Sequence, residues 1–103
     1  MSPTWFAFTG TDAPGAGALR ARLRPDHRQY IRNPRPDCCV VAGGPIVEDD
    51  GDTMVGTLLV LEARDRAAAE RFLADDPYVR AGLFESTTLQ RWAWGLGEPR
   101  SEL

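Results

Sequence analysis

Residues 54–63, MVGTLLVLEA, decide the fold, because they form the clearest β-strand pattern in the 103-residue sequence. The run is apolar at both alternating sets of positions, so a strand here has two faces that avoid water. We expect helices to cover one face of its sheet. A second copy of the chain is the simplest cover for the other face.

A helix is predicted directly after this strand. Asp65 is expected to cap a helix that runs to Ala74, with an apolar stripe formed by Ala68, Ala69, Phe72 and Leu73. Pro77 disfavours helical geometry at Asp76, so the helix should end at that carboxylate. One more helical turn and a last strand complete the chain.

The segment before residues 54–63 predicts two further strands and a helix. Residues 37–42, DCCVVA, form a short apolar run that Gly43-Gly44-Pro45 is expected to end. Pro25 costs about 3 kcal/mol inside a helix, so we expect a kink or a fresh helix start there. The expected elements are strands over 4–9, 37–42, 54–63 and 83–94, helices over 16–31 and 65–74, and a turn of helix over 78–81.

The order β-α-β-β-α-β is the split βαβ arrangement of ferredoxin-like folds. The predicted class is therefore α+β: a four-stranded antiparallel sheet with two helices on one face. Sheet-to-sheet pairing of two copies would give a dimeric α/β barrel. We expect one domain over residues 1–95 and a flexible tail over residues 96–103.

Composition limits the classes of partner. The net charge is −3, and all 12 basic residues are arginine, which argues against binding to a nucleic-acid backbone. The arginines gathered in residues 20–35 are read first as a solvated helix face. No stretch resembles a secretion leader or a membrane span, so a cytoplasmic protein is expected. Cys38 and Cys39 predict two buried free thiols, and with a single histidine they make no metal-ligand pattern.

His27 is the only histidine. Counting about 100° per residue, it shares a helical stripe with Leu19, Leu23 and Tyr30 or Ile31, so its ring should point toward the sheet or its edge. Such a histidine is more often a core residue than a base, and Asp76-Pro77 is more often simple helix punctuation. The residues alone leave both readings open.

Several short motifs, taken together, resemble the YCII-related family: Arg20 seven positions before His27, then Gly44-Pro45, then Asp76-Pro77-Tyr78. The resemblance implies a ferredoxin-like fold, a sheet-to-sheet dimer, and a catalytic dyad of His27 and Asp76. The substrate-binding candidates by position are Arg20, Arg24, Gly44, Pro45, Pro77 and Tyr78. The proline-rich loop at 33–37 and the acidic loop at 46–52 depart from the family pattern.

Some members of this family act without a cofactor on small cyclic or quinone-like compounds. The resemblance therefore implies a cofactor-independent lyase or isomerase that abstracts a proton from a small cyclic or aromatic oxygenated substrate, leading to elimination, isomerisation or cyclisation. No dinucleotide or phosphate-loop motif is present. The alternatives are a non-catalytic small-molecule-binding accessory protein, a cofactor-free oxygenase, and a protein-interaction module. The expected partners are a small molecule and a second copy, with neither nucleic acid nor membrane.

Overall fold

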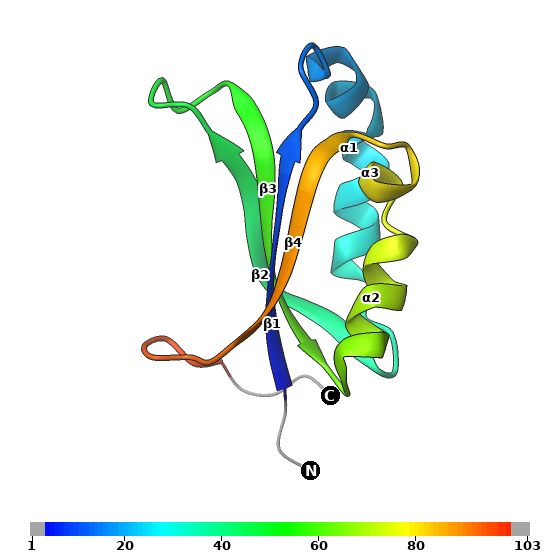
Figure 1. Cartoon of the computed structure of the whole chain (residues 1–103), viewed down its shortest axis with the longest axis vertical. Helices are drawn as coiled ribbons and strands as arrows, with labels where there is room; N and C mark the ends of the chain where they lie inside the picture. Colours follow the sequence, from blue (N-terminus) through cyan, green and yellow to red (C-terminus); the bar gives the residue numbers. More distant parts are fainter. Residues whose placement is uncertain (1–3, 100–103) are drawn as a thin grey trace.

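The computed structural model describes residues 4–99, which form an α+β ferredoxin-like fold (Figure 1). The elements are β1 (Thr4–Asp12), α1 (Gly17–Arg32), β2 (Cys38–Val47), β3 (Met54–Ala63), α2 (Arg66–Ala74), α3 (Pro77–Arg80) and β4 (Phe84–Trp92). The sheet order is β2-β3-β1-β4, and all neighbouring strands are antiparallel. The predicted fold class is confirmed.

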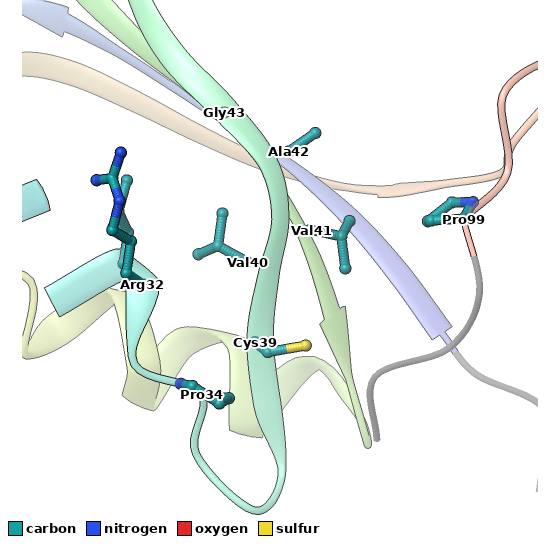
Figure 2. Close-up of a pocket in the computed structure, with 9 residues that line it drawn as sticks. Arg32, Pro34, Cys39, Val40, Val41, Ala42, Gly43 and Pro99 are labelled. Carbon is teal, nitrogen blue, oxygen red and sulfur yellow. The ribbon is translucent and has the colours of Figure 1, made fainter. Parts of the chain in front are cut away.

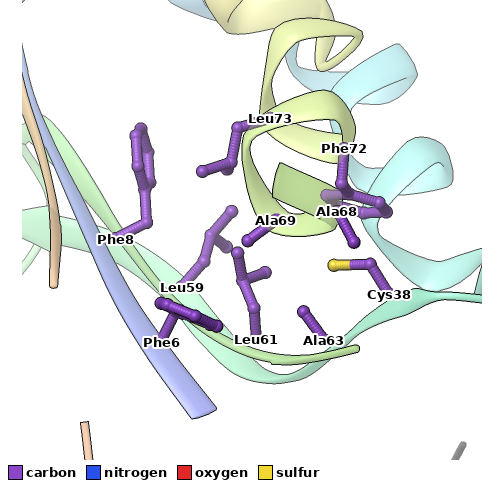
Figure 3. Close-up of a cluster of buried hydrophobic side chains, with 10 residues drawn as sticks. All are labelled: Phe6, Phe8, Cys38, Leu59, Leu61, Ala63, Ala68, Ala69, Phe72 and Leu73. Carbon is purple, nitrogen blue, oxygen red and sulfur yellow. The ribbon is translucent and has the colours of Figure 1, made fainter. Parts of the chain in front are cut away.

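The three helices lie on one face of the sheet (Figure 1). Between them and the sheet is an apolar core, drawn in Figure 3, which consists of Phe6, Phe8, Cys38, Leu59, Leu61, Ala63, Ala68, Ala69, Phe72 and Leu73. The strand residues of this cluster alternate along β1 and β3, as expected when one face of each strand is covered by helices. The cluster therefore joins the central strands to α2.

β3 and α2 occupy the residues predicted for them. The side chain of Asp65 accepts a hydrogen bond from the backbone N–H of Ala68 at 2.8 Å and so caps α2. Gly82 has φ of 71°, a left-handed conformation that glycine adopts without steric cost, and it lies just after α3. Local sequence signals therefore set these boundaries.

The predicted end of the second strand was wrong. β2 continues through Gly43-Gly44-Pro45 to Val47, and Pro45 pairs with Thr57 of β3. A proline lacks the backbone N–H that a central strand needs, but β2 is at the edge of the sheet, where one side of the strand has no partner. β1 is also longer than predicted and reaches Asp12.

A fresh helix start at Pro25 is not observed, because α1 is one helix from Gly17 to Arg32 with Pro25 inside it. The proline removes the hydrogen bond to the carbonyl of Ala21. Ala21 is exposed, so water can solvate that carbonyl. The helix continues past the proline because its inner face, which includes Arg20 and His27, is held in the protein.

The remaining predictions concern the thiols, the tail and membranes. Cys38 and Cys39 are buried and not in a disulfide, and burial raises the pKa of Cys38 to about 12. Residues 1–3 of the predicted domain and 100–103 of the predicted tail lie outside the described residues. Within residues 4–99 no helix is long and apolar enough to cross a membrane.

Candidate active site

The segment Asp76-Pro77-Tyr78 holds a carboxylate in a fixed position. Asp76 lies in extended backbone geometry before Pro77, and its Oδ1 accepts a hydrogen bond from the N–H of Tyr78 at 2.8 Å. Pro77 is the first residue of α3, where a missing N–H costs nothing. Only 1% of Asp76 is exposed. This helix start therefore buries a carboxylate whose orientation the backbone determines.

His27 of α1 meets this carboxylate. Its Nδ1 lies 2.9 Å from Oδ1 and 3.0 Å from Oδ2 of Asp76. An acceptor in this position favours the tautomer that carries its proton on Nδ1, which leaves Nε2 unprotonated. The His27 ring also stacks on Tyr78, with 3.9 Å between centroids and 15° between planes. Residues from α1 and α3 thus fix the imidazole on two sides.

Arg20 lies on the other side of the site and is held by both central strands. Its guanidinium forms a two-pronged ion pair with Asp12 of β1, at 2.6 and 2.8 Å, and donates to Thr57 of β3 at 2.8 Å. The guanidinium carbon is 4.7 Å from the centroid of the Tyr78 ring. Burial disfavours the charge of Arg20, but the hydrogen bonds and charge of Asp12 outweigh it and raise the pKa of Arg20.

Tyr78 links the two groups, because it contacts both His27 and Arg20. Burial raises the pKa of Tyr78 above its ordinary value, while the charges of Arg20 and Arg24 act in the opposite direction. The phenol is therefore neutral at physiological pH and keeps its proton. A neutral phenol is a hydrogen-bond donor as well as an acceptor.

A cavity of about 200 Å³ lies beside these groups. It is lined by Arg20, Arg24, His27, Arg28, Ile31, Arg32, Gly43, Gly44, Pro45, Thr57 and Tyr78. Asp76 and Pro77 are not among the lining residues: Asp76 is in contact with His27, and Pro77 begins α3. The structure therefore gathers the other predicted site residues around one hollow, with the carboxylate as a partner of the imidazole.

Sequence reasoning missed Asp12, Thr57, Arg28 and Arg32. Thr57 had a usable signal, because it falls on the same alternating face of β3 as Leu59 and would be a polar residue facing the helices. Asp12 had none, since an aspartate at the end of a strand is ordinary turn chemistry. Arg28 and Arg32 were assigned to a solvated helix face, yet both line the cavity.

Two other hollows are larger but have different surroundings. One, of about 590 Å³, shares Arg20, Arg24 and Arg28 and is bounded across from them by residues 52–54. The other, of about 410 Å³, is drawn in Figure 2. In that view Val40 lies on the Arg32 side of β2, whereas the sulfur of Cys39 points to the opposite side, so this hollow wraps around a strand edge.

Within residues 4–99, no group of three or more histidine, cysteine, aspartate or glutamate side chains is placed to hold a metal ion. The polar groups that line the 200 Å³ cavity are cations, an imidazole, a hydroxyl and a phenol. Chemically, this set offers a base, a positively charged surround and a neutral hydrogen-bond donor.

A solved structure with a similar chain bears on the activity. This is 5-chloro-2-hydroxyhydroquinone dehydrochlorinase from Burkholderia phenoliruptrix AC1100 in complex with 2,5-dihydroxybenzoquinone. The two chains share 28% sequence identity and a TM-score of 0.77 over 88% of this chain and 95% of that chain. The similar protein is thus a lyase-type enzyme crystallised with a small cyclic ligand.

Two further structures share the fold. PA3566 from Pseudomonas aeruginosa has a TM-score of 0.57 and 18% identity over 89% of this chain and 93% of its own. An antibiotic biosynthesis monooxygenase has a TM-score of 0.57 and 18% identity over 88% and 97%. No curated protein sequence is significantly similar to this chain.

The profile of the YCII-related domain matches residues 4–93. The protein therefore belongs to the YCII-related family.

Proposed function

We propose that this protein is a cofactor-independent lyase or isomerase in which His27 removes a proton from a small cyclic or aromatic oxygenated substrate. The observation that carries this proposal is the double contact of His27 Nδ1 with Asp76 beside a cavity. Nε2 of His27 has no hydrogen-bond partner in the part of the chain that is described, so it is the nitrogen available to a bound molecule.

The proposed reaction begins when Nε2 of His27 takes a proton from a ring hydroxyl or an acidic C–H. Asp76 stabilises the imidazolium that forms, and the electron pair left on the substrate expels a leaving group or moves within the ring. Arg24, one helical turn before His27, lines the cavity and would neutralise the developing oxyanion. Arg20 is already paired with Asp12, so we assign it the positioning of Tyr78 and, through Tyr78, of His27.

Two findings support the substrate class. A cavity of 200 Å³ is slightly larger than the roughly 150 Å³ cavity that accepts benzene, so it fits one substituted ring. The similar dehydrochlorinase was crystallised with 2,5-dihydroxybenzoquinone, a ring of this size. We therefore propose hydroxylated six-membered rings as the first compounds to assay.

The experiment is turnover of 5-chloro-2-hydroxyhydroquinone and of hydroxylated rings without chlorine, followed by product chromatography. His27→Ala and Asp76→Asn are each expected to lower kcat by about 10²–10⁴-fold, because each removes part of the general base. Asp65→Asn is the matched control: Asp65 also caps a helix but does not contact His27. Unchanged turnover in either site variant contradicts the mechanism. Ligand binding that survives Asp76→Asn, with no turnover in any variant, would favour the accessory binding protein.

We also propose that the protein works as a homodimer joined through the face of the sheet opposite the helices. Ile46 of β2, Leu58 of β3 and Trp92 of β4 lie on that face and are 36–41% exposed. Large apolar side chains grouped on one sheet face indicate an interface. The family resemblance supports the same arrangement.

Sedimentation velocity tests this assembly. Leu58→Asp is expected to convert a dimer to a monomer, because it places a charge in the centre of the proposed contact. Leu96→Asp is the matched control, since Leu96 is 93% exposed and lies outside the sheet. A native chain that sediments as a monomer at micromolar concentration would show that this face has another use.

A further inference from the structure

A row of arginines on α1 borders the cavity. Arg20, Arg24, Arg28 and Arg32 are four residues apart, so they lie along one side of the helix with only a gradual rotation. All four line the cavity that holds His27. We call the last three, Arg24, Arg28 and Arg32, the arginine ladder.

The ladder lines a cavity, yet its arginines have no counter-charge in the described structure. Arg20 is paired with Asp12, and outside the site Arg35 pairs with Asp75 and Arg71 with Asp37. No member of the ladder forms an ion pair within residues 4–99, and the cavity lining contains no carboxylate. Positive charge thus remains uncompensated at the site, in a chain whose net charge is −3.

The grouping of these positive charges on α1 is electrostatically unfavourable. Like charges four residues apart on a helix repel each other. The backbone carbonyl of Arg28 accepts a hydrogen bond from Arg32 at 3.0 Å, which holds Arg32 near Arg28. Asp52, an acidic residue that lines the neighbouring hollow together with Arg24 and Arg28, makes no ion pair with the ladder. A bound anion would relieve this repulsion.

We infer that the substrate is itself an anion: a hydroxylated ring that also bears a carboxylate, which Arg28 and Arg32 bind at the exposed rim of the cavity. This inference rests on the proposed function for the identity of the ring. Guanidinium groups bind carboxylates with paired hydrogen bonds, and a carboxylate held there leaves the ring inside the cavity beside His27.

Isothermal titration calorimetry with two probes tests the inference. The probes are 2,5-dihydroxybenzoate and hydroquinone, which differ by the carboxylate alone. The native chain is expected to bind 2,5-dihydroxybenzoate at least about tenfold more tightly, the effect of one good charge-assisted hydrogen bond. Arg28→Gln should reduce this preference, and the double variant Arg28→Gln/Arg32→Gln should abolish it.

Arg22→Gln is the control, because this substitution removes the same charge from the same helix. Arg22 is exposed and lines none of the three hollows. It should leave both affinities within twofold. The inference is overturned if the probes bind equally, if neither binds at millimolar concentration, if the preference survives the double variant, or if Arg22→Gln lowers it as much as Arg28→Gln does.

The test of the arginine ladder and the test of the proposed acid–base mechanism can fail independently of each other. His27→Gln should remove turnover while the preference for 2,5-dihydroxybenzoate persists, because the ladder is intact. If neutral phenols are turned over as well as carboxylated ones, the inference fails and the acid–base mechanism stands. If no compound is turned over but the binding preference depends on Arg28, the mechanism fails and the ladder stands.

Discussion

The layer between the helices and the sheet has two halves that follow opposite rules. Along β1, the residues facing the helices change from Phe6 and Phe8 to Asp12. Along the paired strand β3, they change from Leu61 to Thr57. One half is an apolar cluster, and the other is a network of buried polar groups around Tyr78 and His27. The same two strands therefore support both the stable core and the site of the proposed chemistry.

The two halves are stabilised by different kinds of interaction. The apolar half is stabilised by burial, which is non-directional and tolerates swaps that conserve side-chain volume. The polar half depends on complete pairing, because a buried charge without its partner is costly. Substitutions in the two halves should therefore differ in what they damage.

The largest expected loss of stability comes from the apolar half. Phe72 is 1% exposed and packs between α2 and the sheet, so Phe72→Ala should lower the free energy of unfolding by about 3–5 kcal/mol. Urea denaturation measures this change in the free energy of unfolding. Turnover per folded molecule should remain near normal, since Phe72 is not a lining residue of the cavity. A loss below 1 kcal/mol would show that this half is loosely packed.

An intermediate loss is expected from the polar half. Asp12→Asn removes the charge that holds Arg20, so the free energy of unfolding should fall by about 1.5–3 kcal/mol, the contribution of a hydrogen bond to a charged group. Unlike Phe72→Ala, it should also lower turnover per folded molecule, because Arg20 supports Tyr78. Equal urea midpoints for Asp12→Asn and the native chain would contradict the role given to this pair.

The smallest loss sharpens the comparison between two aspartates that cap helices. Asp65→Ala should cost about 1 kcal/mol, because it removes only the hydrogen bond to Ala68. Asp76→Ala removes the bond to Tyr78 and also leaves buried His27 without a partner, so it should cost more. Thermal unfolding of the two variants gives the difference directly, and equal losses would mean that the contact with His27 adds no stability.

These two aspartates also show how much the sequence can predict. Both helix starts could be read from local chemistry: a capping carboxylate, then an apolar stripe for α2 and a proline for α3. That Asp76 meets His27, 49 residues earlier, depends on how α1 packs against α3. Only the family resemblance indicated that meeting, and local signals could not.

The errors have physical reasons of the same kind. Gly43-Gly44-Pro45 was expected to end a strand, but a strand at the sheet edge tolerates a residue that lacks a donor. Pro25 was expected to interrupt α1, but contacts with the rest of the protein outweigh the cost of one hydrogen bond. In both cases, tertiary position overrides local preference.

The position of Pro45 has a consequence for aggregation. Exposed sheet edges carry unpaired N–H and C=O groups that can recruit a strand from another molecule. On β2, Pro45 supplies no N–H, and irregular register between Val40 and Ala42 and between Ile46 and Val47 breaks the regular ladder that an added strand would need. Pro45 also lines the 200 Å³ cavity beside His27, so a substitution of Pro45 made to improve the fit of a ligand would weaken the protection of this edge against strand addition.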